Sequence, residues 1–186
     1  KRTQSIWIAP LLFRNKLVEE IDEEILFGEE GLIVMKMNSL NDELIMNKLI
    51  EASQAGVKVQ LLVRGFCCLI PGIPGVSENI TVKSIVGRYL EHSRIYKFGS
   101  VDRAKFFIGS GDLLHRNTQR RIEVFIKIKQ QNLKMMVDKI LAVELSHKSD
   151  GWLLGSDGNY VRNKPANPVH SQELLYRYFK KKASLN

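Results

Sequence analysis

Two apolar runs of strand length, at residues 31–37 and 57–63, constrain the fold of this chain more than any other feature. The first run is almost continuously apolar, which is typical of a strand buried on both faces of a sheet. Between the runs, apolar residues recur at helical spacing, with Ser39 or Asn41 as the expected N-cap and Gly56 as the stop signal. Strands joined through a helix in this way run parallel. The unit therefore predicts an α/β fold.

The rest of the chain alternates between the same two element types. Apolar patterning predicts strands at residues 6–9, 80–85, 94–98, 104–108 and 120–129, a hairpin at 152–161, and helices at 12–27, 133–145 and 169–182. In the helix at 133–145 we expect Met136, Ile140 and Val143 to point inward. No internal repeat or linker interrupts the pattern, so residues 1–186 are expected to form a single domain.

The expected cellular compartment follows from sequence features that are absent from the chain. No apolar run approaches the roughly 18 residues of a membrane span, and the first residues lack the apolar region of a signal peptide. Cys67 and Cys68 are adjacent, and neighbouring cysteines rarely form a disulfide with each other, which fits a reducing compartment. We expect a cytoplasmic protein, with membrane association through partners left open. The chain begins without Met, and we expect it to be a fragment of a longer polypeptide.

Positive charge is concentrated in the middle of the chain. Residues 53–130 hold thirteen basic and five acidic side chains, a net charge of +8, whereas residues 1–52 have a net charge of −4. Such a distribution favours an anionic partner, although a solvated positive surface would give the same counts. The four histidines show no metal-ligand spacing, so no metal site is expected.

Arg64 is the first residue after the apolar run 57–63, at the carboxyl end of a predicted parallel strand. Ligands of open α/β sheets bind at this end, and the planar guanidinium suits a pair of phosphate oxygens. Gly65 is expected to let a ligand approach the backbone. The alternative is an Arg64 paired with a loop carboxylate such as Glu78.

His92 and Arg94 lie two residues apart at the start of a predicted strand, so we expect their side chains on the same face. A neighbouring guanidinium disfavours the charged imidazole, which leaves His92 able to accept a proton or attack phosphorus. The alternative is a structural histidine.

A small-residue loop, Gly109-Ser110-Gly111-Asp112, follows the strand predicted at 104–108. Such a loop exposes backbone N–H groups to an anion. In the next predicted strand, Arg121 is expected to share a face with Glu123. The order of the two motifs, His92-x-Arg94 and then Gly-Ser-x-Asp, resembles the phospholipase D superfamily, which uses His-x-Lys followed by Gly-Ser-x-Asn. The resemblance implies a phospholipase-D-like mixed sheet flanked by helices. The replacements of Lys by Arg and of Asn by Asp count against a phosphodiesterase.

A closer resemblance is to the polyphosphate kinase family of the first type, in its last, C-terminal catalytic domain. It is carried by residues 36–40, 51–57, 62–65, 67–75, 77–80 and 84–96, and continues through 116–117 and 121–124. The resemblance implies an enzyme that reversibly moves the terminal phosphate of ATP to polyphosphate through a phosphohistidine. That histidine and the arginines that hold Mg²⁺ belong to the preceding domain, so we expect the isolated chain to be inactive. The implied partners are ATP or ADP, polyphosphate and the preceding domains, with a homo-oligomer expected for the full-length enzyme.

The resemblance also implies roles for individual residues. Arg64 corresponds to an arginine that contacts ATP, and His92 to a second essential histidine at the same site, where it would assist the leaving oxygen. Arg121 and Glu123 fall at further phosphate-site positions, and Arg94 is expected to help Arg64 and Arg121 stabilise the transferring group.

Two other readings remain open at this point. One is a phosphodiesterase or a module that binds the backbone of nucleic acids, since a basic α/β domain suits both. Against it, no aromatic residues are interleaved among Arg64, Arg94 and Arg121 as a stacking platform for bases. The other is a structural fragment that needs its missing domains for any measurable affinity.

Overall fold

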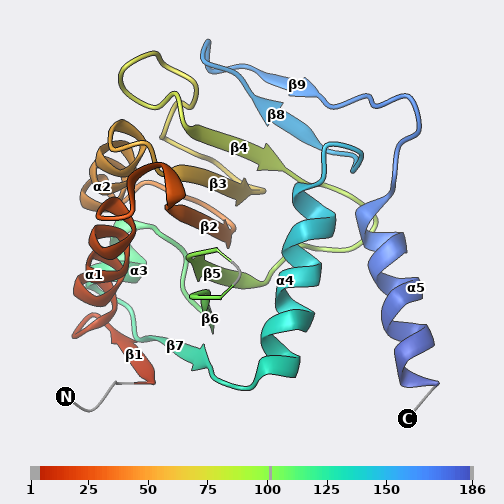
Figure 1. The fold of residues 1–186 in the computed structure, drawn as a ribbon, viewed down its shortest axis with the longest axis horizontal. Coiled ribbons are helices and arrows are strands. Elements are labelled where there is room, and N and C mark those ends of the chain that lie inside the picture. The colour runs from red at the N-terminus through yellow and green to blue at the C-terminus, as the bar shows by residue number, and fades with distance from the viewer. Residues whose placement is uncertain (1–4, 101, 185–186) are drawn as a thin grey trace.

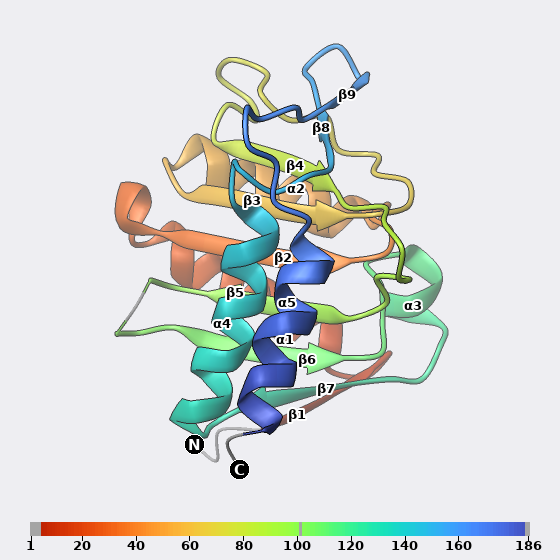
Figure 2. The ribbon, with the colours of Figure 1, turned by 90° about the vertical axis from the view of Figure 1, so that its right-hand side faces the viewer.

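A mixed β-sheet forms the centre of the molecule, with helices on both faces (Figures 1 and 2). The computed structural model describes residues 5–100 and 102–184. Within them the sheet has nine strands in the order β1-β7-β6-β5-β2-β3-β4-β8-β9. Their bounds are β1 Ile6–Ala9, β2 Leu32–Met37, β3 Lys58–Val63, β4 Ile80–Ser84, β5 Arg94–Phe98, β6 Lys105–Gly109, β7 Glu123–Ile128, β8 Trp152–Leu154 and β9 Tyr160–Arg162.

The helices form two layers. In Figure 1 one layer lies to the left of the sheet and contains α1 and α2, and the other lies to the right and contains α4 and α5. The helix bounds are α1 Phe13–Ile25, α2 Glu43–Gln54, α3 His115–Gln119, α4 Gln131–Leu145 and α5 Ser171–Ala183, with a 3₁₀ turn at Gly28–Glu30. The expected fold class, a mixed sheet flanked by helices, is confirmed.

Strands β2 and β3 pair in parallel on either side of the connection through α2, as the sequence predicts. The N-cap of α2 is Asp42, however, and not Ser39 or Asn41: its carboxylate accepts a hydrogen bond from the Ile45 amide at 3.2 Å. Asp42 is fully buried and also pairs with Arg14 and accepts from the Thr118 hydroxyl. Tertiary contacts therefore select the cap among three residues that could each serve.

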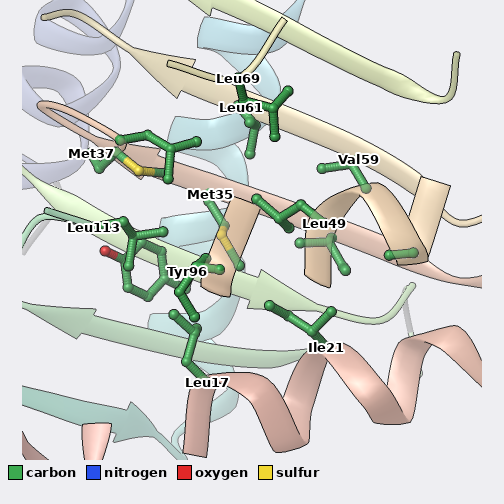
Figure 3. Packing of buried hydrophobic residues seen from close by; sticks show 14 of the residues in the cluster. Leu17, Ile21, Met35, Met37, Leu49, Val59, Leu61, Leu69, Tyr96 and Leu113 are labelled. Atoms are coloured by element: carbon green, nitrogen blue, oxygen red, sulfur yellow. The ribbon is translucent and has the colours of Figure 1, made fainter. Parts of the chain in front are cut away.

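The larger hydrophobic core lies between the sheet and helices α1 and α2 (Figure 3). Leu17 and Ile21 from α1 and Leu49 from α2 meet Met35 of β2 and Tyr96 of β5, and all five are fully buried. Each such side chain stabilises the fold by about 1.5 to 3 kcal/mol. This core fixes the central strands that position the site described below.

A smaller core lies on the opposite face, under α4. Val137 and Leu141 of α4 are buried there against sheet residues such as Val34 and Ile95. Of the three inward positions expected for this helix, Val143 is buried, whereas Met136 and Ile140 are only half-buried. The inward face of α4 is therefore rotated by about one residue from the expected one.

The strand expected at residues 120–129 begins only at Glu123. The preceding residues belong to α3, a short helix that the sequence analysis does not anticipate, and to its exit: the Arg120 and Arg121 amides both donate to the Arg116 carbonyl. Other predicted elements agree to within a few residues, including the parallel unit and the hairpin of β8 and β9, which pair antiparallel. Among the residues described, no helix is both long and apolar enough to cross a membrane.

Candidate active site

Several polar side chains far apart in sequence meet at one edge of the sheet. Asn38 follows β2 and Arg64 follows β3, so both lie at the carboxyl ends of parallel strands. Strand β5 runs antiparallel to β2 and begins at Arg94 at the same edge, and β6 ends there, three residues before Asp112. In Figure 2 this edge lies to the right, where the arrowheads of β2, β3 and β6 point.

Asp112 bonds to both Arg94 and Asn38 at this edge. Its two carboxylate oxygens accept from Nε and Nη2 of Arg94, both at 3.1 Å, which makes a bidentate ion pair. The same carboxylate accepts from the Asn38 backbone amide at 2.7 Å and from its side-chain Nδ2 at 3.2 Å. Asp112 and Arg94 are both buried, with 7% and 8% exposed. Asp112 thereby joins β2 to β5 at the end of the sheet.

This arrangement corrects two expectations. The Nη1 group of Arg94 donates to the carbonyl oxygen of His92. The guanidinium is therefore turned toward the protein and does not face a solvent-exposed anion. The side chains of His92 and Arg94 also do not share a strand face, because β5 begins at Arg94 and His92 lies in the exposed segment before it. Alternation along a strand does not apply outside the strand.

Arg64, Asn38 and His92 form the part of the edge that solvent can reach. Nε of Arg64 donates to Oδ1 of Asn38 at 2.7 Å, and its Nη2 lies 3.1 Å from Nδ1 of His92. Nδ2 of Asn38 lies 3.5 Å from the same ring nitrogen. Within the described residues Nη1 of Arg64 makes no hydrogen bond, which leaves one edge of the guanidinium open. Arg64 does not pair with Glu78, the alternative partner expected from the sequence. The Glu78 carboxylate instead accepts from the Gly75 amide.

These contacts define the tautomer of His92. Arginine and the Asn38 Nδ2 group are donors only, so Nδ1 of His92 must present its lone pair. A neutral imidazole then carries its proton on Nε2. The orientation of Asn38 is fixed as well, because its oxygen faces the Arg64 donor and its nitrogen faces Asp112.

Gly65 is required by a close crossing of two loops. Its amide donates to the Asn38 carbonyl at 2.7 Å. A Cβ at this position would lie 2.6 Å from the Ser39 Oγ and 2.8 Å from the Asn38 oxygen. Glycine is therefore needed here because the Asn38 backbone comes close to Gly65. The expected role, access of a ligand to the Gly65 backbone, does not account for it.

The loop after β6 is bonded to β7 through Ser110, whose backbone amide is therefore not open to an anion. The Ser110 amide donates to the Val124 carbonyl, and its hydroxyl donates to Oε2 of Glu123 at 2.5 Å. Glu123 is buried and also accepts from Nδ2 of Asn117 at 2.6 Å. Arg121 is exposed in the bend before β7, so it does not share a strand face with Glu123.

The structure thus brings together Arg64, His92 and Arg94, whereas Arg121 lies in the α3–β7 connection and Glu123 at the start of β7. Asn38 and Asp112 complete the edge, although the sequence analysis assigns neither a role. Asn38 carries the same signal as Arg64, a polar residue directly after an apolar strand. The described residues contain no group of three or more His, Cys, Asp or Glu side chains placed to hold a metal ion.

Comparisons with known proteins identify the family of this domain. A family model described as polyphosphate kinase C-terminal domain 2 matches residues 6–172. A polyphosphate kinase of Synechocystis sp. is 45% identical over 175 residues, which cover 92% of this chain and 24% of that protein. This chain therefore spans about a quarter of the length of such relatives.

Solved structures give the same picture of the fold. The crystal structure of polyphosphate kinase from Porphyromonas gingivalis matches with a TM-score of 0.89 and 32% identity, over 100% of this chain and 29% of that one. A phospholipase D family member, Nuc from Salmonella typhimurium, shares the fold with a TM-score of 0.56 at 16% identity, covering 75% of this chain and 91% of that one. The strand-end cluster around Arg64 and His92 thus lies in a domain that belongs to the polyphosphate kinase C-terminal domain 2 family.

Proposed function

We propose that this domain supplies phosphate-binding and hydrogen-bonding groups for the reversible transfer of the terminal phosphate of ATP to polyphosphate. The observation that carries the proposal is the Arg64–His92 hydrogen bond, which brings an open guanidinium edge beside the exposed imidazole of His92. The nucleophilic histidine and bound Mg²⁺ are assigned to the preceding domain of the same polypeptide, by resemblance to the family.

Arg64 is suited to hold phosphate oxygens. Phosphoryl transfer depends mainly on positioning and on charge placed against the phosphate oxygens. Arg64 keeps Nε and Nη2 on Asn38 and His92, so its direction is set before a ligand arrives. Its Nη1 edge then meets the terminal phosphate without reorganisation. Arg94, in contrast, acts by holding Asp112 and the His92 carbonyl in place.

His92 is suited to assist the leaving oxygen. With Nδ1 accepting from Arg64, the ring proton is on Nε2, from which His92 can donate a hydrogen bond to an oxygen of ADP as the bond to phosphorus breaks. The same hydrogen bond is available in the reverse direction. A preorganised donor of this kind contributes roughly 10²- to 10³-fold to the rate.

Arg121 and Glu123 take secondary roles in this proposal. Arg121 is an exposed cation near the end of α3, suited to a passing polyphosphate chain, whose charge makes binding dependent on salt. Glu123 supports the loop that carries Asp112 through its bonds to Ser110 and Asn117. A filter-binding comparison of polyphosphate with single-stranded DNA at matched salt separates this reading from a nucleic-acid module.

The role of His92 is tested in the full-length enzyme that contains this domain. His92→Ala should lose most turnover yet still trap labelled phosphate on the histidine of the preceding domain. Added imidazole should restore part of the rate, with a pH profile shifted toward that of the added base. If peptide mapping of the wild-type enzyme finds the label on His92 itself, the assisting role is wrong and this domain supplies the nucleophile.

A further inference from the structure

The segment that carries His92 has little of its own to hold it in place. Residues 86–93 connect β4 to β5 without a helix or strand, and most of their side chains are exposed. The apolar side chains of Val86 and Leu90 are 70% and 72% exposed, so they contribute little packing. The position of His92 must therefore depend on polar contacts around this segment.

Lys36 of β2 makes one of these contacts. It lies on the central strand β2, two residues before Asn38, and is only 5% exposed. Its Nζ lies 2.6 Å from Oε2 of Glu91, the residue directly before His92, and 2.5 Å from Oε1 of Glu144 on α4. Lys36 thus ties the His92 segment to two fixed elements.

Gln172 at the start of α5 holds the same segment from the other side. Its Nε2 donates to the Tyr89 carbonyl and to Oε1 of Glu91, both at 2.7 Å, and its Oε1 accepts from the Tyr89 amide at 2.9 Å. A Cβ on Gly87 would lie 2.5 Å from Oε1 of Gln172, so a glycine lets the segment pass this close. Glu91 is therefore held on both carboxylate oxygens.

Burying the charged side chains of Lys36, Glu91 and Glu144 together costs free energy. One ammonium faces two carboxylates, and among residues 5–100 and 102–184 the buried Oε2 of Glu144 finds no hydrogen-bond partner. Burial raises the pKa of Glu144 to about 7, against the opposing charge of Lys36. Burial also acts to raise the pKa of Glu91, but the bond to Lys36 outweighs it and the pKa is lowered. Buried ion pairs of this kind often add no net stability compared with apolar side chains, so stability alone does not account for the cluster.

We propose that Lys36 is a positioning residue for His92: it holds Glu91, and thereby sets where the imidazole meets Arg64. The inference rests on the proposed role of His92 in phosphate transfer. Glu91 is fixed by Lys36 and Gln172, and the His92 carbonyl is fixed by Arg94, so the backbone is held on both sides of the His92 Cα. A displacement of about 1 Å at a reacting group can cost roughly 10²-fold in rate.

The test is a double-mutant cycle in the full-length enzyme. Lys36→Met should lower kcat for phosphate transfer by roughly 10²-fold in the wild-type background. In the His92→Ala background the same change should cost less than about threefold, because its target is gone. The matched control is Lys97→Met, which removes a comparable bridge from β5 to Asp138 of α4 and leaves residues 86–93 untouched. It should stay within about threefold of wild type.

A second variant guards against a misfolded Lys36→Met protein. Gln172→Leu changes a half-buried residue at the start of α5 and removes the other support of Glu91. It should lower kcat in the same His92-dependent way, with an unchanged far-UV spectrum and melting temperature.

The outcomes separate the two proposals. Equal losses from Lys36→Met with and without His92, or no loss from either Lys36→Met or Gln172→Leu, would overturn the positioning role while the proposed role of His92 at the leaving oxygen stands. Full activity of His92→Ala alone would instead overturn the proposed function.

Discussion

The Nη2 group of Arg64 donates to Nδ1 of His92 across 3.1 Å, joining the end of β3 to the segment that leads into β5. This bond occupies one of the two ring nitrogens, and Asn38 approaches the same atom at 3.5 Å. Nε2 is then the ring nitrogen that remains for a substrate. Any chemistry of His92 in this arrangement must pass through Nε2.

Replacing Arg64 by Ala in the full-length enzyme should weaken the use of ATP. The change removes a charged donor from the phosphate and also frees the imidazole of His92. We expect kcat/KM for ATP to fall by an amount equivalent to about 1.5 to 3 kcal/mol, the scale of a hydrogen bond to a charged group. Initial rates at limiting ATP measure this effect.

The control for Arg64 is Arg162→Ala, which removes an exposed arginine from the edge strand β9. Both variants lower the net charge by one, so a purely electrostatic attraction of ATP would affect them alike. Equal kinetics for the two variants would mean that Arg64 is structural.

The strand and helix order can be predicted from the sequence because burial leaves a strong pattern. The run at residues 31–37 is apolar except for Lys36 since β2 is covered on both faces, and Arg64 stands out because a polar residue directly follows a mainly apolar strand. The same signal precedes Asn38. The strand-end position of both Arg64 and Asn38 can therefore be predicted from the sequence.

What could not be predicted depends on contacts between distant residues. The alternation of residues 120–129 extends the strand pattern back to the end of α3, so the sequence predicts Arg121 in a strand that begins only at Glu123. In the sequence, Glu144 cannot be distinguished from other polar residues of its helix, and its partner Lys36 lies 108 positions away. No local pattern marks such a pair. Long-range packing decides both cases.

Asp112→Ala should be strongly destabilising, because it leaves the buried guanidinium of Arg94 without its counter-charge. Removing one partner of a buried pair costs about 3 to 5 kcal/mol. Urea unfolding of the 186-residue chain at pH 7 measures the loss. The comparison is Glu173→Ala, which breaks an exposed pair with Arg177 on α5 and should cost no more than about 1 kcal/mol. Similar losses in the two variants would show that the Arg94–Asp112 pair is not effectively desolvated.

Glu144 should make the stability of the chain depend on pH between its ordinary pKa of 4.5 and its raised pKa of about 7. Burial favours the protonated carboxyl, so the folded state binds this proton more tightly than the unfolded state. The resulting stabilisation is fully present below pH 4.5 and is lost as the pH rises through about 7. The charged groups that face Glu144 are Lys36 of β2, Glu91, and Lys83 of β4.

Glu144→Gln tests this dependence, because a neutral amide can still accept from Lys36 but has no proton to lose. We expect the free energy of unfolding in urea to fall less between pH 5 and pH 8 in this variant than in the unchanged chain. Glu51→Gln, at an exposed carboxylate that pairs with Lys48, is the control and should follow the unchanged chain. If Glu144→Gln keeps the full fall in stability, the carboxylate of Glu144 is already ionised at pH 5, and Lys36 compensates the buried charges of both Glu91 and Glu144 at neutral pH.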